Sequence, residues 1–362
     1  MEAFKIKNGL SAKRYLGSNG TETAGSVGYD LAGASYDSKS FSVASQDANP
    51  TGVAFSSDGT KMYITGNTND NVFQYTLSTA FDISTASYDS VSLSVTPQTS
   101  VAVNLTFKPD GSALYVAGTT AVYQYTLTTN YDLSTAAYAS KSLTVSGQEN
   151  SNQGVTLSAD GTKVYIVGTT NDTVYQYTLS TAWDLSTGSY ASKSLSVTSQ
   201  DTQPRGLTLN NDGTKVYVLG QTGGAVFQYT LSTAYDITTG SYDSVTFSVS
   251  SQEGTPQGLV FGDNGTKLYV VGLTNDTIYQ YSTASLTQTL DLSTGTTFSF
   301  TPSGATTVSF TNPPATGIAI GFTVEINGDG SAITWPDSVK WSGGTAPTAT
   351  ASKELYAFVT TN

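Results

Sequence analysis

The chain has 362 residues, of which 12% are charged, and its formal net charge is −12 at pH 7. It contains no Cys and no His, which excludes disulfides, thiol nucleophiles, zinc sites of the Cys/His type and Ser-His-Asp triads. The acidic balance disfavours binding to nucleic acid, and no pattern in the sequence points to a metal or cofactor.

Residues 1–28 are expected to form an N-terminal arm. Apolar and basic side chains alternate at its start, and we expect them to dock on another protein: Phe4, Lys5, Ile6, Lys7 and Leu10. A disordered start is the alternative. No apolar run follows the basic residues, so the segment is not expected to be a secretory signal peptide.

A repeat of about 50 residues occupies residues 29–284. Each copy carries an Asp-Gly or Asn-Gly turn, whose glycines are Gly59, Gly111, Gly161, Gly213 and Gly265. Such turns join antiparallel strands because both residues tolerate positive φ. Four short strands can be assigned to each copy, so the sequence predicts an all-β fold, a five-bladed β-propeller.

The order of the strands predicts how the ring closes. Groups of three inner strands begin near Gly52, Ala102, Gly154, Gly206 and Gly258, and outer strands begin near Tyr36, Tyr88, Tyr138, Tyr190 and Tyr242. The first outer strand therefore precedes the first group, and the last group is followed by none. We expect the strand at residues 36–43 to complete the last blade as a clasp, which also covers an exposed strand edge.

Alternating aromatic residues mark the third strand of each copy. Alternation places both members of each pair on one face of the strand. We expect these rings to pack between blades: Phe73/Tyr75, Tyr123/Tyr125, Tyr175/Tyr177, Phe227/Tyr229 and Tyr279/Tyr281.

The first two strands of a copy carry a recognisable pattern. In the first copy it reads Pro50-Thr-Gly-Val-Ala-Phe-Ser-Ser-Asp-Gly-Thr-Lys-Met-Tyr-Ile64. This resembles the repeats of surface-layer and lactonase-like propellers over roughly residues 29–283. The resemblance implies the fold and says little about function.

Residues 285–362 depart from the repeat. They contain short alternating segments such as Thr297–Phe300, Thr307–Phe310 and Gly321–Ile326. Many short strands in so few residues predict a small β-sandwich or jelly-roll-like domain.

Both ends of the chain resemble virion proteins of tailed bacteriophages. At the C-terminal end the resemblance rests on Asp291-Leu-Ser-Thr-Gly295, Ile333-Thr-Trp-Pro336 and Val339-Lys-Trp-Ser-Gly-Gly-Thr-Ala-Pro347, and at the N-terminal end on Phe4-Lys-Ile-Lys-Asn-Gly-Leu10. It implies a fibre or spike protein located in the virion and assembled in the host cytoplasm. The arm would then dock on other virion proteins, and the chain could form a homo-oligomer such as a trimer.

An aromatic residue followed by Asp opens the loop before each outer strand. Together the ring and the carboxylate suit binding of a sugar ring, so these are the candidate glycan contacts: Phe81, Tyr131, Trp183, Tyr235, Asp82, Asp132, Asp184 and Asp236. The alternative is structural, with the ring covering a neighbouring strand and the Asp capping a turn.

Other acidic residues could support chemistry but recur from copy to copy. Asp47, Glu149, Asp201 and Glu253 precede the first inner strand, and Asn69-Asp70, Asn171-Asp172 and Asn275-Asp276 occupy turns that could offer oxygen ligands to calcium. Repetition favours turn formation over catalysis or metal binding. We therefore expect a non-enzymatic display protein that binds a glycan or protein on the host surface or decorates the particle. A free lectin and a glycan-degrading enzyme are the alternatives.

Overall fold

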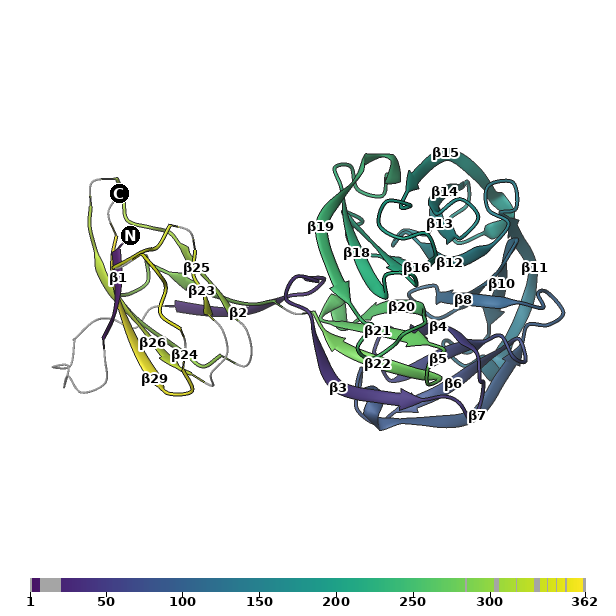
Figure 1. Ribbon diagram of the computed structural model, residues 1–362, viewed down its shortest axis with the longest axis horizontal. Coiled ribbons are helices and arrows are strands. Elements are labelled where there is room, and N and C mark those ends of the chain that lie inside the picture. Colours follow the sequence, from purple (N-terminus) through teal and green to yellow (C-terminus); the bar gives the residue numbers. More distant parts are fainter. Residues whose placement is uncertain are drawn as a thin grey trace. The chain divides into compact units, whose positions relative to one another are not determined.

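The computed structural model describes residues 2–6, 21–283, 285–302, 306–316, 318–328, 333–336, 338–342, 344–348 and 350–360 (Figure 1). Two compact units divide the chain: residues 29–283 form one, and residues 1–28 with 284–362 form the other. The part of the chain that the structure describes is built from strands and five 3-10 helices, which confirms the all-β prediction. None of the helices among these residues is long and apolar enough to cross a membrane.

Residues 29–283, all of which are described, form five four-stranded antiparallel sheets of the propeller type. Sheet 1 contains β4 (Pro50–Phe55), β5 (Lys61–Gly66), β6 (Asn71–Leu77) and β7 (Ala86–Ser94). Sheet 2 contains β8 (Ala102–Phe107), β9 (Ala113–Gly118), β10 (Ala121–Leu127) and β11 (Ala136–Thr144). Sheet 3 contains β12 (Asn152–Leu157), β13 (Lys163–Gly168), β14 (Thr173–Leu179) and β15 (Gly188–Ser196).

The last two sheets continue the pattern and close it. Sheet 4 contains β16 (Pro204–Leu209), β17 (Lys215–Gly220), β18 (Ala225–Leu231) and β19 (Gly240–Ser248). Sheet 5 contains β20 (Pro256–Gly262), β21 (Lys267–Gly272), β22 (Thr277–Ser282) and, as its outer strand, β3 (Ser35–Ser42). Tyr36 lies opposite Tyr281 in this pairing, so the strand expected as a clasp joins the last sheet.

The innermost strands contact one another in a cycle, in the order β4, β8, β12, β16, β20 and back to β4, and Figure 1 shows the resulting ring. Five apolar cores lie between the sheets, each shared by two neighbours around the ring. The paired aromatic residues of the third strands belong to these cores, as predicted. The ring is therefore stabilised by burial between sheets.

Buried tyrosines also link neighbouring sheets by hydrogen bonds. The tyrosine of each second strand donates its hydroxyl to the carbonyl of the aromatic residue in the next sheet's loop. The pairs are Tyr63 with Tyr131, Tyr115 with Trp183, Tyr165 with Tyr235, Tyr217 with Tyr29, and Tyr269 with Phe81. This chain of contacts runs once around the ring and closes on itself.

The other unit contains two sheets around one core. One has the order β24 (Thr297–Phe300), β26 (Gly321–Asn327), β29 (Lys353–Val359), β1 (Glu2–Ile6), β28 (Lys340–Trp341), and the other β2 (Thr21–Val27), β23 (Ser285–Asp291), β25 (Thr306–Thr311), β27 (Ile333–Thr334). Its buried core takes side chains from both sheets, including Leu290 and Val308 from one and Phe298, Val324 and Phe358 from the other.

The separate N-terminal arm needs correction, because β1 pairs with β29 and β2 pairs with β23. Pairing satisfies backbone groups that a free strand would leave to water. Of the expected docking residues, Phe4, Lys5 and Ile6 lie in β1. Lys7 and Leu10 lie outside the described residues.

Candidate functional site

The loops that lead into the outer strands hold the predicted aromatic residues, and Tyr29 at the equivalent position, in an uncommon backbone conformation. Tyr29, Phe81, Tyr131, Trp183 and Tyr235 all have positive φ, between 58° and 69°. Each donates its amide to the carbonyl of the turn glycine of its own sheet, as Trp183 does to Gly161 at 2.9 Å. The ring then lies directly over that glycine, where an added Cβ would come within 2.1–2.4 Å of ring carbons. The turn glycine and the ring therefore require each other.

The aspartates that follow these rings cap a 3-10 helix in all four predicted places, and three of them also form an ion pair. Oδ1 of each of these aspartates caps the short 3-10 helix behind it, as Asp184 accepts from the Ser186 amide at 3.1 Å. Oδ2 forms an ion pair with a lysine of the preceding sheet: Lys39 with Asp82, Lys141 with Asp184, and Lys193 with Asp236. The hydrogen bonds from Lys141 and Lys193 lower the pKa of Asp184 and Asp236. Asp132 caps its helix in the same way but has no lysine partner in the described chain.

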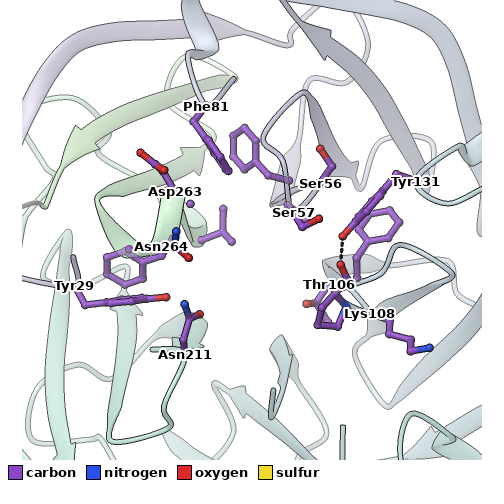
Figure 2. A pocket seen from close by; sticks show the side chains of 18 residues that line it. Tyr29, Ser56, Ser57, Phe81, Thr106, Lys108, Tyr131, Asn211, Asp263 and Asn264 are labelled. Atoms are coloured by element: carbon purple, nitrogen blue, oxygen red, sulfur yellow. Dashed lines mark hydrogen bonds between the residues drawn. The ribbon is translucent and has the colours of Figure 1, made fainter. Parts of the chain in front are cut away.

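An open pocket of about 390 Å³ lies where the inner strands β4, β8 and β20 end (Figure 2). We call it the axial pocket. Phe55, Phe107 and Phe261 form part of its wall, and Tyr29, Phe81 and Tyr131 surround the opening. A smaller pocket of about 170 Å³ shares Phe107 and Asn211 with it and contains Trp183 and Tyr235. The structure thus brings the predicted aromatic residues to one end of the ring, together with Tyr29.

The polar side chains of the axial pocket differ from sheet to sheet. The residue that precedes the turn Asp or Asn is Ser57, Pro109, Ala159, Asn211 or Asp263. Ser57, Asn211 and Asp263 are exposed, and Asp263 is the one carboxylate among the residues that line the axial pocket, all of which lie within the described range 29–283. Burial raises the pKa of the neighbouring Tyr29 to about 12, so its phenol stays neutral at physiological pH.

The turn that carries Asp263 is unlike the other four. Asp263, Asn264 and Gly265 have φ of 49°, 52° and 82°, whereas in the other turns only the glycine is positive. Positive φ costs a non-glycine residue about 1 kcal/mol or more, and such strain is often found at functional sites. The Thr266 hydroxyl donates to Asp263 Oδ2 at 2.8 Å.

Lys108 is the one cation among the described residues that line the axial pocket, but its side chain extends away from the opening (Figure 2). Its ammonium lies 2.7 Å from Asp110. The hydrogen bond from Lys108 lowers the pKa of Asp110 to about 2. Lys108 is therefore neutralised by its own turn.

The acids before the first strands hold loops together, which agrees with the turn interpretation. Oδ1 or Oε1 of each accepts two backbone amides; Glu149, for example, accepts those of Ser151 and Thr170 at 2.8 and 3.1 Å. Asp47, Asp201 and Glu253 do the same in their sheets. Each acid lies against the glycine that ends the second strand.

The aspartates of the three Asn-Asp turns do not all make the same contact. Asp70 Oδ1 accepts the amide of Ala102 at 3.1 Å. The equivalent neighbours of Asp172 and Asp276 are Pro204 and Pro50, which have no amide hydrogen, and Oδ1 of both aspartates is buried with no hydrogen-bond partner among the residues that the structure describes. Burial, and then nearby carboxylates, raise the pKa of both. Among the described residues, no three His, Cys, Asp or Glu side chains are grouped so as to hold a metal ion.

Asp263 and Asn211 escaped the sequence interpretation. The signal was a departure from the repeat, since the fifth turn reads Gly262-Asp263-Asn264-Gly265 and places its acid one residue earlier than the others. Residues that break the repeat are not marked by the features that recur in it.

Among known proteins, no curated protein matches the chain. Solved structures that resemble it include a functionally unknown protein from Desulfotomaculum acetoxidans (13% identity, TM-score 0.40, covering 62% of each chain). Two others are candidate 6-phosphogluconolactonases: one from Bacteroides uniformis (15%, 0.41, covering 62% of this chain and 64% of that one) and one from Bacteroides fragilis (14%, 0.40, 66% and 72%). The chain thus spans less than two thirds of the first two structures, and at these TM-scores the likeness carries no argument.

The match to a protein family is firmer. The family described as lactonase, 7-bladed β-propeller, matches residues 31–255, which is more than half of the chain. Its name specifies seven blades, whereas residues 29–283 form five four-stranded sheets. The family is named for an enzymatic activity, so the expectation of a non-enzymatic protein is overturned. The chain belongs to the lactonase family of β-propellers.

Proposed function

We propose that the chain is a display protein of a tailed-phage particle and binds host-surface carbohydrate in the axial pocket. One observation carries the binding role: an open pocket of about 390 Å³ with aromatic walls and exposed polar groups contributed by Ser57, Asn211 and Asp263. The apolar face of a pyranose packs on aromatic rings, and its hydroxyls bond to amide, hydroxyl and carboxylate groups.

The differences between sheets support a specific ligand over a purely structural role. A ring closed by equivalent sheets needs equivalent turns. Ser57, Asn211 and Asp263 occupy one repeat position with three different side chains, and Asp263 does so on a strained backbone. An asymmetric set of hydrogen-bonding groups suits an asymmetric ligand.

The particle context is supported by the resemblance of both chain ends to phage virion proteins. In this proposal the partners are other virion proteins and a host glycan, and residues 29–283 form a complete five-bladed ring despite the family's seven-bladed name. The cyclic contact among β4, β8, β12, β16 and β20 supports that count. An experimental structure with a sixth sheet would refute the five-bladed count.

The binding proposal is tested on arrays of purified bacterial surface polysaccharides with the full chain. Asp263→Asn and Asn211→Ala should each weaken binding about tenfold or more, because each removes a hydrogen bond to the ligand. Asp184→Asn makes the same charge change at an ion-paired aspartate outside the lining of the axial pocket, so it is the matched control and should bind normally.

Two results would contradict the proposal. One is the absence of binding to any polysaccharide, and the other is binding that the two pocket substitutions leave intact. Immunogold electron microscopy with antibody to residues 29–283 tests the particle context separately, and phage particles without label, with the epitope accessible, would refute that context.

Hydrolysis of a sugar lactone is the second candidate, favoured by the family match. In this mechanism the Asp263 carboxylate takes a proton from water, and the resulting hydroxide attacks the lactone carbonyl. The bond from that carbonyl to the ring oxygen breaks, the ring oxygen takes the proton back from Asp263, and an open hydroxy acid is released. Asn211 and Ser57 lie on the same pocket and could hydrogen-bond the lactone oxygens.

This activity is measured by alkali consumption with glucono-δ-lactone, corrected for spontaneous opening. Asp263→Asn should lower the enzymatic rate about 100-fold or more, since general-base catalysis contributes about 10²- to 10⁴-fold. A rate in the unsubstituted chain equal to the spontaneous rate, or one that Asp263→Asn does not change, would refute Asp263 as the base.

A further inference from the structure

Lysine–aspartate ion pairs connect neighbouring sheets of the ring, and they show how an ammonium group is bound at these junctions. In three of the five junctions, a lysine on an outer strand places its ammonium 2.5–2.7 Å from Oδ2 of the aspartate in the next sheet's loop. These lysines, Lys39, Lys141 and Lys193, each lie opposite a glutamine of the third strand. The same aspartate position therefore holds a positive charge three times within one chain.

The junction of sheets 1 and 2 has the aspartate but not the lysine. Val91 lies opposite Gln74 in the register that lysine occupies elsewhere. Asp132 still caps its 3-10 helix through Oδ1, by accepting from the Ser134 amide at 3.0 Å and hydroxyl at 2.6 Å. Its Oδ2 has no ion pair or hydrogen bond with any residue that the structure describes.

The space beside Asp132 is a pocket of about 660 Å³, which we call the junction groove. Its walls include Val91, Asn130, Tyr131 and Asp132, with further hydroxyl groups from Thr129 and Ser134. Asp58, Asp89 and Lys61 also line it, and Lys61 already pairs with Asp89 at 2.9 Å. The groove therefore has an excess of negative charge. Asp132 Oδ2 lies at the position that binds a lysine ammonium in the three sister junctions.

We propose that the junction groove binds the ammonium group of an amino sugar, with Asp132 Oδ2 as its acceptor. Two features favour a sugar over a simple cation. The groove carries the hydroxyl and amide groups that recognise a polyol, and it shares Ser56 and Tyr131 with the axial pocket. An oligosaccharide could therefore place one residue in each, and in this respect the inference rests on the proposed glycan-binding function.

The junction of sheets 4 and 5 also lacks the lysine, because Val245 lies opposite Gln228. There Asp30 uses Oδ1 to accept the amides of Ala32 and Gly33 at 3.0 and 3.3 Å. A test of the junction groove must therefore report on its own residues rather than on total binding.

The experiment titrates the full chain, methyl-labelled at valine and threonine, with a glucosamine trisaccharide at mildly acidic pH, where its amines are protonated. The Val91 methyl signals should shift, and the N-acetylated trisaccharide, which has no ammonium, should bind about 10- to 100-fold more weakly, because a hydrogen bond to a charged group is lost. Asp132→Asn should weaken the amino sugar by the same factor.

Two further variants make the result specific. Val91→Lys supplies an internal ammonium, as in the three sister junctions, and should abolish the ligand-induced shift of the Thr129 methyl signal, a second reporter that lines the groove. Asp184→Asn makes the same charge change at a junction already filled by Lys141 and should leave the Val91 shifts unchanged.

Equal binding of the two trisaccharides, or amino-sugar shifts at Val91 that survive Asp132→Asn, would overturn the inference. Val260 lines the axial pocket and reports on it separately. Shifts at Val91 without shifts at Val260 would support the groove and count against the axial pocket, and the reverse pattern would refute the groove alone.

Discussion

Replacing Tyr165 by phenylalanine tests whether the tyrosine hydrogen bonds stabilise the ring. Tyr165 is fully buried, and its hydroxyl donates to the Tyr235 carbonyl of the next sheet at 2.8 Å. Tyr165→Phe keeps the packing of the aromatic side chain but leaves the Tyr235 carbonyl without its hydrogen-bond donor. An intramolecular hydrogen bond contributes about 0.5–1.5 kcal/mol net, and an unsatisfied buried group costs about 1–3 kcal/mol, so we expect a loss of about 1–2 kcal/mol.

The assay is urea unfolding of the full chain, with the free-energy change taken from the shift in midpoint at unchanged slope. In a unit of this size the same loss lowers the melting temperature by about 2–8 °C. Tyr138→Phe is the control, because Tyr138 is 37% exposed and its hydroxyl has no hydrogen bond to a described residue. Equal stability of the two variants would refute the argument that these bonds hold neighbouring sheets together.

Two other predictions concern single positions. Gly161→Ala should lower the free energy of unfolding by about 2 kcal/mol or more, because Gly161 has a φ of 68° and a Cβ there would lie 2.1 Å from the Trp183 ring. In the control Gly147→Ala, the added Cβ meets no atom within 4 Å, so stability should change by less than about 0.5 kcal/mol. Similar losses for the two variants in urea unfolding would contradict this prediction. Asp276→Asn should stabilise the fold at neutral pH, because burial, Asp47 and Glu253 raise the pKa of Asp276, so ionisation costs the native state free energy above that raised pKa. The difference in free energy of unfolding between Asp276→Asn and the unsubstituted chain should shrink as pH falls through the raised pKa and vanish below the unfolded pKa of about 3.9. A difference that does not depend on pH, or an equal difference for Asp70→Asn, would refute the raised pKa of Asp276.

The repeat made much of the ring predictable. Asp-Gly turns and alternating strands are local signals. They predicted the positions of the strands, the packing of aromatic side chains between sheets and the pairing of β3 with β22. The ion pairs were harder to predict from the sequence, because their partners are far apart along the chain. Lys193 and Asp236, for example, are 43 residues apart and meet only when two sheets pack. The N-terminal strands escaped prediction for the same reason, since β1 gains its partners from the far end of the chain.

The candidate site was predictable only in part. The aromatic residues were identified because they recur, but their common position over a turn glycine depends on a positive φ that no sequence pattern specifies. Asp132 was identified together with three aspartates that the structure finds paired. Only the register of Val91 separates it from them, and register is a property of the assembled sheet.

The pairing of β2 with β23 gives the chain the organisation of one domain inserted into another. Val27 and Ser285 are cross-strand neighbours, and residues 29–283 lie between them in the sequence. Within the inserted ring, the Asp30 amide donates to the Thr283 carbonyl at 3.1 Å, so the ring begins and ends at one point. Excising it would leave a gap that a two-residue hairpin turn can bridge. Recombination at the two sequence positions that flank the ring, before residue 29 and after residue 283, could therefore exchange one ring for another of different specificity while the strands on either side keep their register.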